Sequence, residues 1–187
     1  MEWDISAECV SIIMLNIIMV YSWKGNLLPS RKNQAFRACL LITYLSILTN
    51  ILSTLLLTRL SATTYLINQL LLHLNYIFTP LMGMVYYIYT LTIVFEQDAK
   101  SLKKHVLLAS IPALLYLACL FSNPLTHLLF SLDPVFGYQR GAWVILTYAV
   151  FYIYVLFSVF FTISKRRNID SAVFIILNFF PVLCAVV

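Results

Sequence analysis

Six long stretches of the sequence contain no Asp, Glu, Lys or Arg, and this pattern constrains the fold more than any other feature. They cover residues 9–23, 38–58, 65–95, 106–132, 141–164 and 171–187. A helix needs about 20 apolar residues to cross roughly 30 Å of membrane hydrocarbon. Apolar residues make up 62% of the chain and charged residues 10%, whereas soluble domains average about 45–50% and 25%. The sequence therefore predicts an all-α fold, a polytopic transmembrane helical bundle.

We predict six spans within one transmembrane domain that fills residues 1–187, with the fourth span ending near Ser122. The predicted spans are 9–23, 38–58, 65–95, 106–122, 141–164 and 171–187. The opening segment MEWDISAE carries three acidic residues, where a cleaved signal peptide would carry Lys or Arg. The first span is therefore predicted to remain in the mature protein.

The basic residues predict the orientation of the chain in the membrane. Cytoplasmic loops are enriched in Lys and Arg, and ten of the twelve basic residues follow the first, third or fifth span. These ten are Lys24, Arg31, Lys32, Arg37, Lys100, Lys103, Lys104, Lys165, Arg166 and Arg167. We therefore expect a multi-pass plasma-membrane protein with its amino terminus outside. The net charge of +5 is explained by these loops, so no nucleic-acid partner is predicted.

The third span is too long for a perpendicular crossing. Residues 65–95 form 31 positions, which extend about 46 Å as a helix. Pro80 and Gly83 lie near the middle, and a proline removes one helical hydrogen bond and clashes with the preceding turn. We expect a kink between Thr79 and Gly83, and we take Pro80, Gly83 and Pro181 of the sixth span as candidate hinges.

The connection at 122–141, between the fourth and fifth spans, is too apolar for a freely solvated loop. Leu128, Leu129, Phe130 and Leu132 lie close together in it. We expect this segment to fold back on the outer mouth of the bundle, or to lie in the membrane interface as a short helix.

The residues of this chain carry no recognisable enzyme chemistry. There is no nucleophile elbow, zinc-protease motif, phosphate-binding loop or Gly-rich dinucleotide turn, so the chain itself is predicted not to be an enzyme and to hold no cofactor or metal. The four cysteines are Cys9, Cys39, Cys119 and Cys184, and none share a metal-binding spacing. They are interpreted as small buried hydrophobes, with one disulfide among Cys9, Cys119 and Cys184 left open.

A polar face on the third span is the first candidate ligand-binding site. Gln69, His73 and Tyr76 are spaced by four and three residues, which places them on one side of a helix. An ionisable group within a membrane span faces protein or water, and such groups are functional candidates. The alternative is a neutral histidine whose hydrogen bond serves helix packing alone.

Two further spans contribute candidate ligand-binding residues. Asn50 belongs to a small and polar series that includes Ser46 and Ser53 on one face of the second span, and such faces also let membrane helices pack closely. Tyr148 and Tyr152 share a face of the fifth span at a spacing of four. Their alternative role is core packing with a satisfied hydroxyl.

The stretch SNPLTHLLFSLDPVFGYQRGAWVILTYAVFYIYVLF resembles part of a known bacterial family. It is similar to the amino-terminal multi-helix membrane region that precedes GGDEF diguanylate cyclase domains and some histidine kinases. The points of likeness are the NPxxH start, an aspartate in the loop, Tyr-x-x-Gly before the next span, and the tyrosine-rich helix that follows. The family-motif positions are Asn123, His127, Asp133, Tyr138 and Gly141, and the resemblance assigns a role to none of them.

The resemblance implies a membrane-embedded sensory input region that regulates a cytoplasmic output domain, a GGDEF diguanylate cyclase or else a histidine kinase. Such regions have seven helices, so the sequence is expected to be a fragment whose seventh span and output domain follow Val187. The alternative is a six-helix substrate-binding membrane protein, such as the vitamin-binding subunit of an energy-coupling-factor transporter. The predicted partners are membrane lipid and a small-molecule or lipophilic signal, and the sequence leaves a homodimer open.

Overall fold

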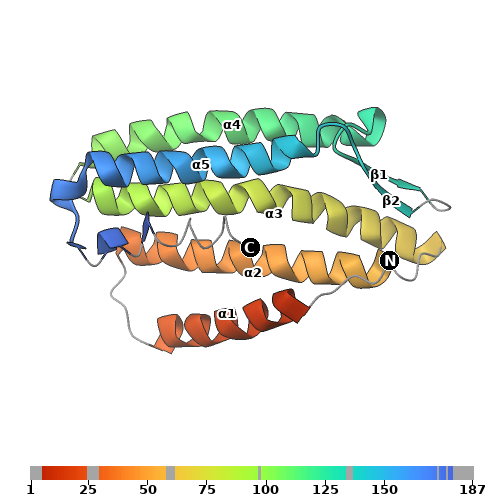
Figure 1. Cartoon of the computed structure of the whole chain (residues 1–187), viewed down its shortest axis with the longest axis horizontal. Coiled ribbons are helices and arrows are strands. Elements are labelled where there is room, and N and C mark those ends of the chain that lie inside the picture. The colour runs from red at the N-terminus through yellow and green to blue at the C-terminus, as the bar shows by residue number, and fades with distance from the viewer. Residues whose placement is uncertain are drawn as a thin grey trace.

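The computed structural model describes residues 6–24, 30–57, 62–96, 98–133, 137–171, 173–175 and 177–178, and these are largely helical (Figure 1). The long helices are α1 (Ser6–Lys24), α2 (Arg31–Leu57), α3 (Ala62–Val94), α4 (Ala99–Thr126) and α5 (Ile145–Ser164). A short antiparallel hairpin, β1 (Phe130–Asp133) and β2 (Gly137–Arg140), connects α4 to α5, and a 3₁₀ turn, η1 (Arg166–Asn168), follows α5.

Each of the five long helices is long and apolar enough to cross a membrane. The first five predicted spans each overlap one of α1 to α5, and two of them, 9–23 and 106–122, lie wholly within a helix. The largest difference is at the fifth span, where α5 begins at Ile145 instead of residue 141. The sixth predicted span lies mostly outside the described residues, and the part of 171–178 that is described is helical. Pro181 and Cys184 lie outside the described residues.

The helix α3 is the centre of the bundle. It packs most extensively on α2 and α5 and also contacts α4. The four helices run side by side, with α3 and α5 in one direction and α2 and α4 in the other (Figure 1). Half of the residues in the most apolar stretch of α3 are buried, whereas only 11% are buried in the most apolar stretch of α2. The outer helices instead expose large apolar side chains, such as Leu107, Leu125 and Ile145. Hydrocarbon solvent would remove the cost of exposing them.

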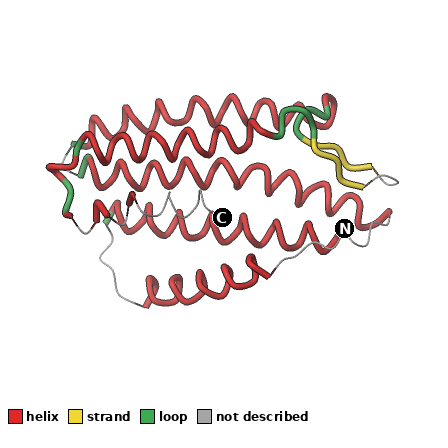
Figure 2. Tube along the Cα trace, in the orientation of Figure 1, coloured by secondary structure: helices red, strands yellow, loops and turns green. Residues whose placement is uncertain are grey.

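Pro80 lies inside α3 without ending it, and the helix is continuous from Ala62 to Val94. The predicted change of direction is visible near the middle of the helix (Figure 2). Because proline has no N–H group, the carbonyl of Tyr76, four residues earlier, loses its helical partner. The hydroxyl of Tyr116 on α4 lies 3.0 Å from this carbonyl and donates to it. The Thr147 hydroxyl on α5 lies 3.0 Å from the same phenol oxygen, so three helices meet at the proline.

Gly83 lies at a close approach between α3 and α5. A Cβ atom at this position would lie 3.0 Å from the backbone oxygen and from the ring of Phe151. A missing side chain lets membrane helices pack backbone to backbone. The structure therefore gives Gly83 a packing role, and its predicted role as a hinge stays a prediction.

The start of α4 is fixed by a side-chain cap. Asp98 accepts hydrogen bonds from the backbone N–H groups of Lys100 and Ser101 and from the Ser101 hydroxyl, which lies 2.6 Å away. Carboxylates are strongly preferred at this position because they satisfy the unpaired N–H groups of the first turn. These bonds, chiefly the one from the Ser101 hydroxyl, hold the pKa of Asp98 below its ordinary value.

The helix α1 lies at the edge of the bundle beside α2 (Figure 1). Its apolar side chains Val10, Ile13 and Ile17 are each about 60% exposed. Polar contacts join it to α2 near both ends. The Asn50 amide nitrogen donates to the Glu8 carboxylate at 3.2 Å, and the Arg37 guanidinium donates to the carbonyl of Ser22 at 3.3 Å.

Candidate functional site

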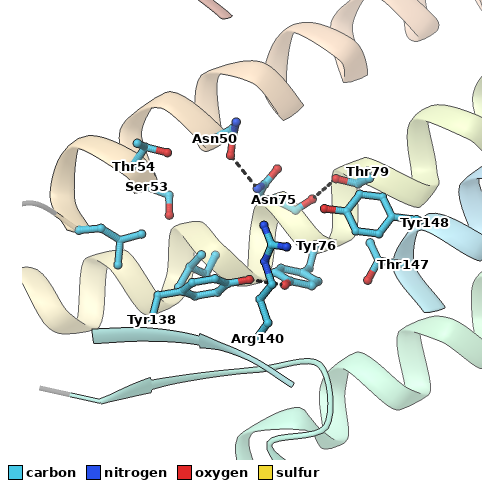
Figure 3. A pocket seen from close by; sticks show the side chains of 12 residues that line it. Asn50, Ser53, Thr54, Asn75, Tyr76, Thr79, Tyr138, Arg140, Thr147 and Tyr148 are labelled. Carbon is cyan, nitrogen blue, oxygen red and sulfur yellow. Dashed lines mark hydrogen bonds between the residues drawn. The ribbon is translucent and has the colours of Figure 1, made fainter. Parts of the chain in front are cut away.

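A polar cavity of about 140 Å³ lies at the end of the bundle that carries the β1–β2 hairpin, which we call the hairpin end (Figure 3). Its walls come from α2, α3, α5 and β2, four separate parts of the chain. The lining residues are Asn50, Ser53, Thr54, Leu57, Leu72, Asn75, Tyr76, Thr79, Tyr138, Arg140, Thr147 and Tyr148.

The hairpin is held against the bundle by a buried asparagine at the end of α4. The Asn123 amide nitrogen donates to the Phe130 carbonyl at 2.9 Å, and its oxygen accepts from the N–H group of Leu129 at 2.8 Å. Asn123 is 2% exposed, and Leu129 and Phe130 are equally buried. His127 ends α4 in a left-handed conformation, with its N–H group bonded to the Asn123 carbonyl. Two of the motif positions therefore shape the chain reversal that starts the hairpin.

The other motif positions lie in the hairpin itself. Asp133 pairs with Gly137 at its tip and Tyr138 pairs with Leu132. Gly141 closes its base, where its N–H group donates to the Leu129 carbonyl at 2.9 Å. The segment thus folds back on the mouth of the bundle, which is one of the two predicted arrangements, but the predicted short helix is wrong. A hairpin is favoured instead because Gly137 adopts a positive φ of 73°, and because apolar and polar residues alternate in β1.

A pair of tyrosines joins the hairpin to α3. The hydroxyl oxygens of Tyr138 and Tyr76 lie 2.7 Å apart, as the dashed line in Figure 3 shows. The Tyr76 ring stacks on Phe130, with 4.7 Å between ring centroids. Nearer the start of α3, the Tyr65 hydroxyl donates to the Leu132 carbonyl at 3.1 Å. The hairpin therefore forms one wall of the cavity through contacts with the first half of α3.

A chain of amides forms the opposite wall. The Asn75 amide nitrogen donates to the Asn50 oxygen at 3.2 Å, and Asn50 donates in turn to Glu8 on α1. Beside this pair, the Ser53 hydroxyl donates to the buried Asn68 oxygen at 3.0 Å. The series on α2 that includes Asn50 and Ser53 therefore faces α3. Its members serve packing and cavity lining together.

Arg140 brings a positive charge to the cavity. It is the last residue of β2, and Figure 3 shows its side chain pointing between Asn75 and Tyr76. The lining includes no acidic residue. Within the described parts of the chain, no carboxylate lies in ion-pair contact with this guanidinium. The charge is thus available to whatever enters the cavity.

Three of the six predicted ligand-binding residues line this cavity, namely Asn50, Tyr76 and Tyr148. The other three lie elsewhere. The His73 ring packs edge-on against Phe130 at 4.9 Å, beneath the hairpin. Its Nδ1 atom lies 2.7 Å from the Gln69 carbonyl, so Nδ1 carries a proton and donates. Tyr152 is 42% exposed on the outer face of α5.

Several lining residues were not predicted from the sequence. No spacing in the sequence distinguishes Asn75, Thr54, Thr79 or Thr147 from the other polar residues of the spans. Arg140 had one available signal, because it is one of two basic residues outside the three basic loops. Its relevance depends on the hairpin folding back, which the sequence did not specify in detail.

A larger and mostly apolar hollow, of about 470 Å³, lies between α4 and α5. Its walls include Leu108, Pro112, Phe157 and Phe160, with His105 at one end. A lipophilic molecule would fit this hollow better than the polar cavity. Cys9, Cys39 and Cys119 form no disulfide with one another, and Cys9 is exposed, so its interpretation as a buried residue is wrong. The described residues include no group of three or more His, Cys, Asp or Glu side chains that could hold a metal ion.

No protein-family model, curated protein or solved structure matches this chain. The resemblance to the sensor region of bacterial diguanylate cyclases and histidine kinases therefore stays a prediction.

Proposed function

We propose that this chain is a membrane-embedded sensory module that binds a small ligand in the cavity at the hairpin end. The observation that carries the proposal is the composition of that cavity: four parts of the chain converge on a polar space, and one of them is a hairpin attached to α3 through the Tyr76–Tyr138 pair. Ligand pockets combine a formed hollow with a few placed polar groups. Because four elements form the cavity, a ligand that binds in it can change the relative positions of those elements.

Membrane residence is part of the proposal and rests on the five apolar helices and their exposed apolar surfaces. The proposed orientation rests on the positive charges. The three groups of basic residues lie at the ends of α1 and α5 and at the starts of α2 and α4. All of these helix termini are at the end of the bundle opposite the hairpin, which we call the basic end. The basic end would face the cytoplasm and the hairpin end the exterior.

Cysteine labelling of intact cells is expected to show this orientation. In a background without native cysteines, Gln139→Cys on the exposed side of β2 should react with a membrane-impermeant maleimide. Lys104→Cys, at a residue that is also exposed and lies at the basic end, should react only after the cells are lysed. Reaction of Lys104→Cys in intact cells, with Gln139→Cys protected, would reverse the proposed orientation.

Transmission of a signal requires that ligand binding shift the helix positions, since a ligand acts only through unequal affinity for two states. We expect spin labels at Lys24 and Lys104, on α1 and α4 at the basic end, to change their separation when a pool of host metabolites is added to protein in lipid nanodiscs. Helix shifts in signalling proteins are about 1–2 Å, so a change of this order in the mean distance is expected.

The control for this measurement is Thr54→Trp, which places an indole in the cavity and should abolish the change. An unchanged separation in the wild-type protein, with every fraction of the pool, would contradict a sensory role. The transport alternative predicts in addition that proteoliposomes containing the chain and an energising module accumulate the ligand. The sensory proposal predicts binding without accumulation.

A further inference from the structure

The balance of charge in the cavity indicates the chemical class of the ligand. Arg140 supplies a full positive charge, and the other polar lining side chains are neutral amides, hydroxyls and phenols. Arg140 is exposed, so water weakens its field, but no acidic residue lines the cavity to offset its charge. An anion would complete this cavity, whereas a cation would be repelled.

The hydrogen-bond donors also favour an anion. Tyr76 and Tyr138 share one hydrogen bond between their hydroxyls, and two phenols hold two hydrogens. One O–H group of the pair is therefore always free to donate to a third group. The hydroxyls of Thr54 and Tyr148 also face the cavity, and neither forms a hydrogen bond within the described parts of the chain. The cavity is therefore lined by at least three hydroxyl donors in addition to the planar guanidinium group of Arg140.

The cavity has room for about six non-hydrogen atoms. Its volume is about 140 Å³, and a cavity of about 150 Å³ in another protein accommodates benzene. Leu57 and Leu72 form part of the wall, so the ligand needs an apolar portion as well as its charged group. An inorganic phosphate would leave these leucines facing polar oxygens, and its second charge would have no cation.

We propose that the ligand of this cavity is a small organic carboxylate with a short hydrocarbon portion. This inference rests on the proposed ligand-binding function and specifies its substrate class. Arg140 binds the carboxylate in a two-pronged arrangement, which the planar guanidinium favours. Tyr148 and the free hydroxyl of the Tyr76–Tyr138 pair donate to the same group, and the hydrocarbon portion lies against Leu57 and Leu72.

The test uses the purified full chain in lipid nanodiscs and four probes. Sodium butyrate has the inferred chemistry, butyramide has the same shape without the charge, and inorganic phosphate and chloride are anions without the apolar portion. Affinity is read from the rise of the thermal unfolding midpoint with probe concentration, because a ligand that binds only the folded state stabilises it. We expect butyrate to bind at least tenfold more tightly than each of the other three probes.

Matched variants assign that preference to the cavity. Arg140→Gln should lower butyrate affinity at least tenfold and leave butyramide affinity unchanged, and Arg140→Lys should recover only part of the loss because it lacks the fork. Lys104→Gln removes a charge at the basic end and should have no effect. Tyr148→Phe should weaken butyrate severalfold without lowering the unfolding midpoint of the free protein.

The outcomes separate this inference from the proposed function. Equal affinity for butyrate and butyramide, or undiminished butyrate affinity in Arg140→Gln, would overturn the carboxylate assignment while cavity binding stands. Absence of butyrate binding would overturn it as well. The sensory proposal would then depend on the spin-label measurement with the metabolite pool, which makes no assumption about the ligand.

Discussion

Gly141→Ala is expected to destabilise the protein strongly, because an added Cβ atom meets backbone on two sides. It would lie 2.1 Å from the Leu128 carbonyl oxygen and 2.8 Å from that of His127. Backbone atoms cannot rotate away, so the base of the hairpin must move. The hydrogen bonds from Gly141 to Leu129 and from Trp143 to Leu128, each 2.9 Å, would be lost or stretched.

The expected cost is about 2–5 kcal/mol, from two weakened hydrogen bonds and the strain of overpacking. Thermal unfolding in detergent measures it, and hydrogen exchange locates it, with protection lost at residues 130–133 and 137–140 while the helices keep theirs. Gly83→Ala is the matched control. Its added Cβ would lie 3.0 Å from Phe151, and a smaller loss is expected. Native hairpin protection in Gly141→Ala would contradict this account of the hairpin base.

The second large effect is expected at the junction of three helices around Pro80. Tyr116→Phe removes the hydroxyl that donates to the Tyr76 carbonyl, at a side chain that is 2% exposed. A buried carbonyl without a partner costs about 1–3 kcal/mol. In a Pro80→Ala background, the new N–H group of residue 80 would serve the same carbonyl. Tyr116→Phe should then cost at most about 1 kcal/mol.

A double-mutant cycle on the free energy of unfolding measures this coupling. We expect a coupling of about 1–2 kcal/mol between Tyr116→Phe and Pro80→Ala, since the two changes act on one carbonyl. Pro124→Ala, at a proline of α4 two turns away from Tyr116, is the control and should be additive with Tyr116→Phe. Additivity in both cycles would mean that the Tyr116 hydroxyl does not compensate for the proline.

The positions of the helices could be predicted from the sequence because membrane spans depend on a local property. A helix that crosses hydrocarbon excludes charge from the part that contacts it, and each of α1 to α5 overlaps one predicted charge-free span. The neighbours of each helix depend instead on pairwise contacts between distant residues. The central position of α3 in the bundle could not be predicted from the sequence. The hydrogen bond from Tyr116 to the carbonyl left without a partner by Pro80 could not be predicted either.

The candidate site was predicted in part for a related reason. Spacing along α3 correctly places His73 and Tyr76 on the same side, but a helix face is wide, and the hairpin covers His73 while the Tyr76 hydroxyl reaches the cavity. Arg140 could not be assigned to the site from local sequence. Its place there follows from the buried hydrogen bonds of Asn123, which reverse the chain at the end of α4.

The polar contacts at the two ends of α1 have a mechanical consequence. In lipid, apolar contact between helices gains little over contact with acyl chains, so α1 would behave as a rod attached at two points, Glu8–Asn50 and Ser22–Arg37. A ligand that turned the Asn75 amide away from Asn50 would loosen the first attachment and leave the second as a pivot. With 19 residues, the rod is about 28 Å long, so a small rotation about that pivot would sweep its far end through several ångströms.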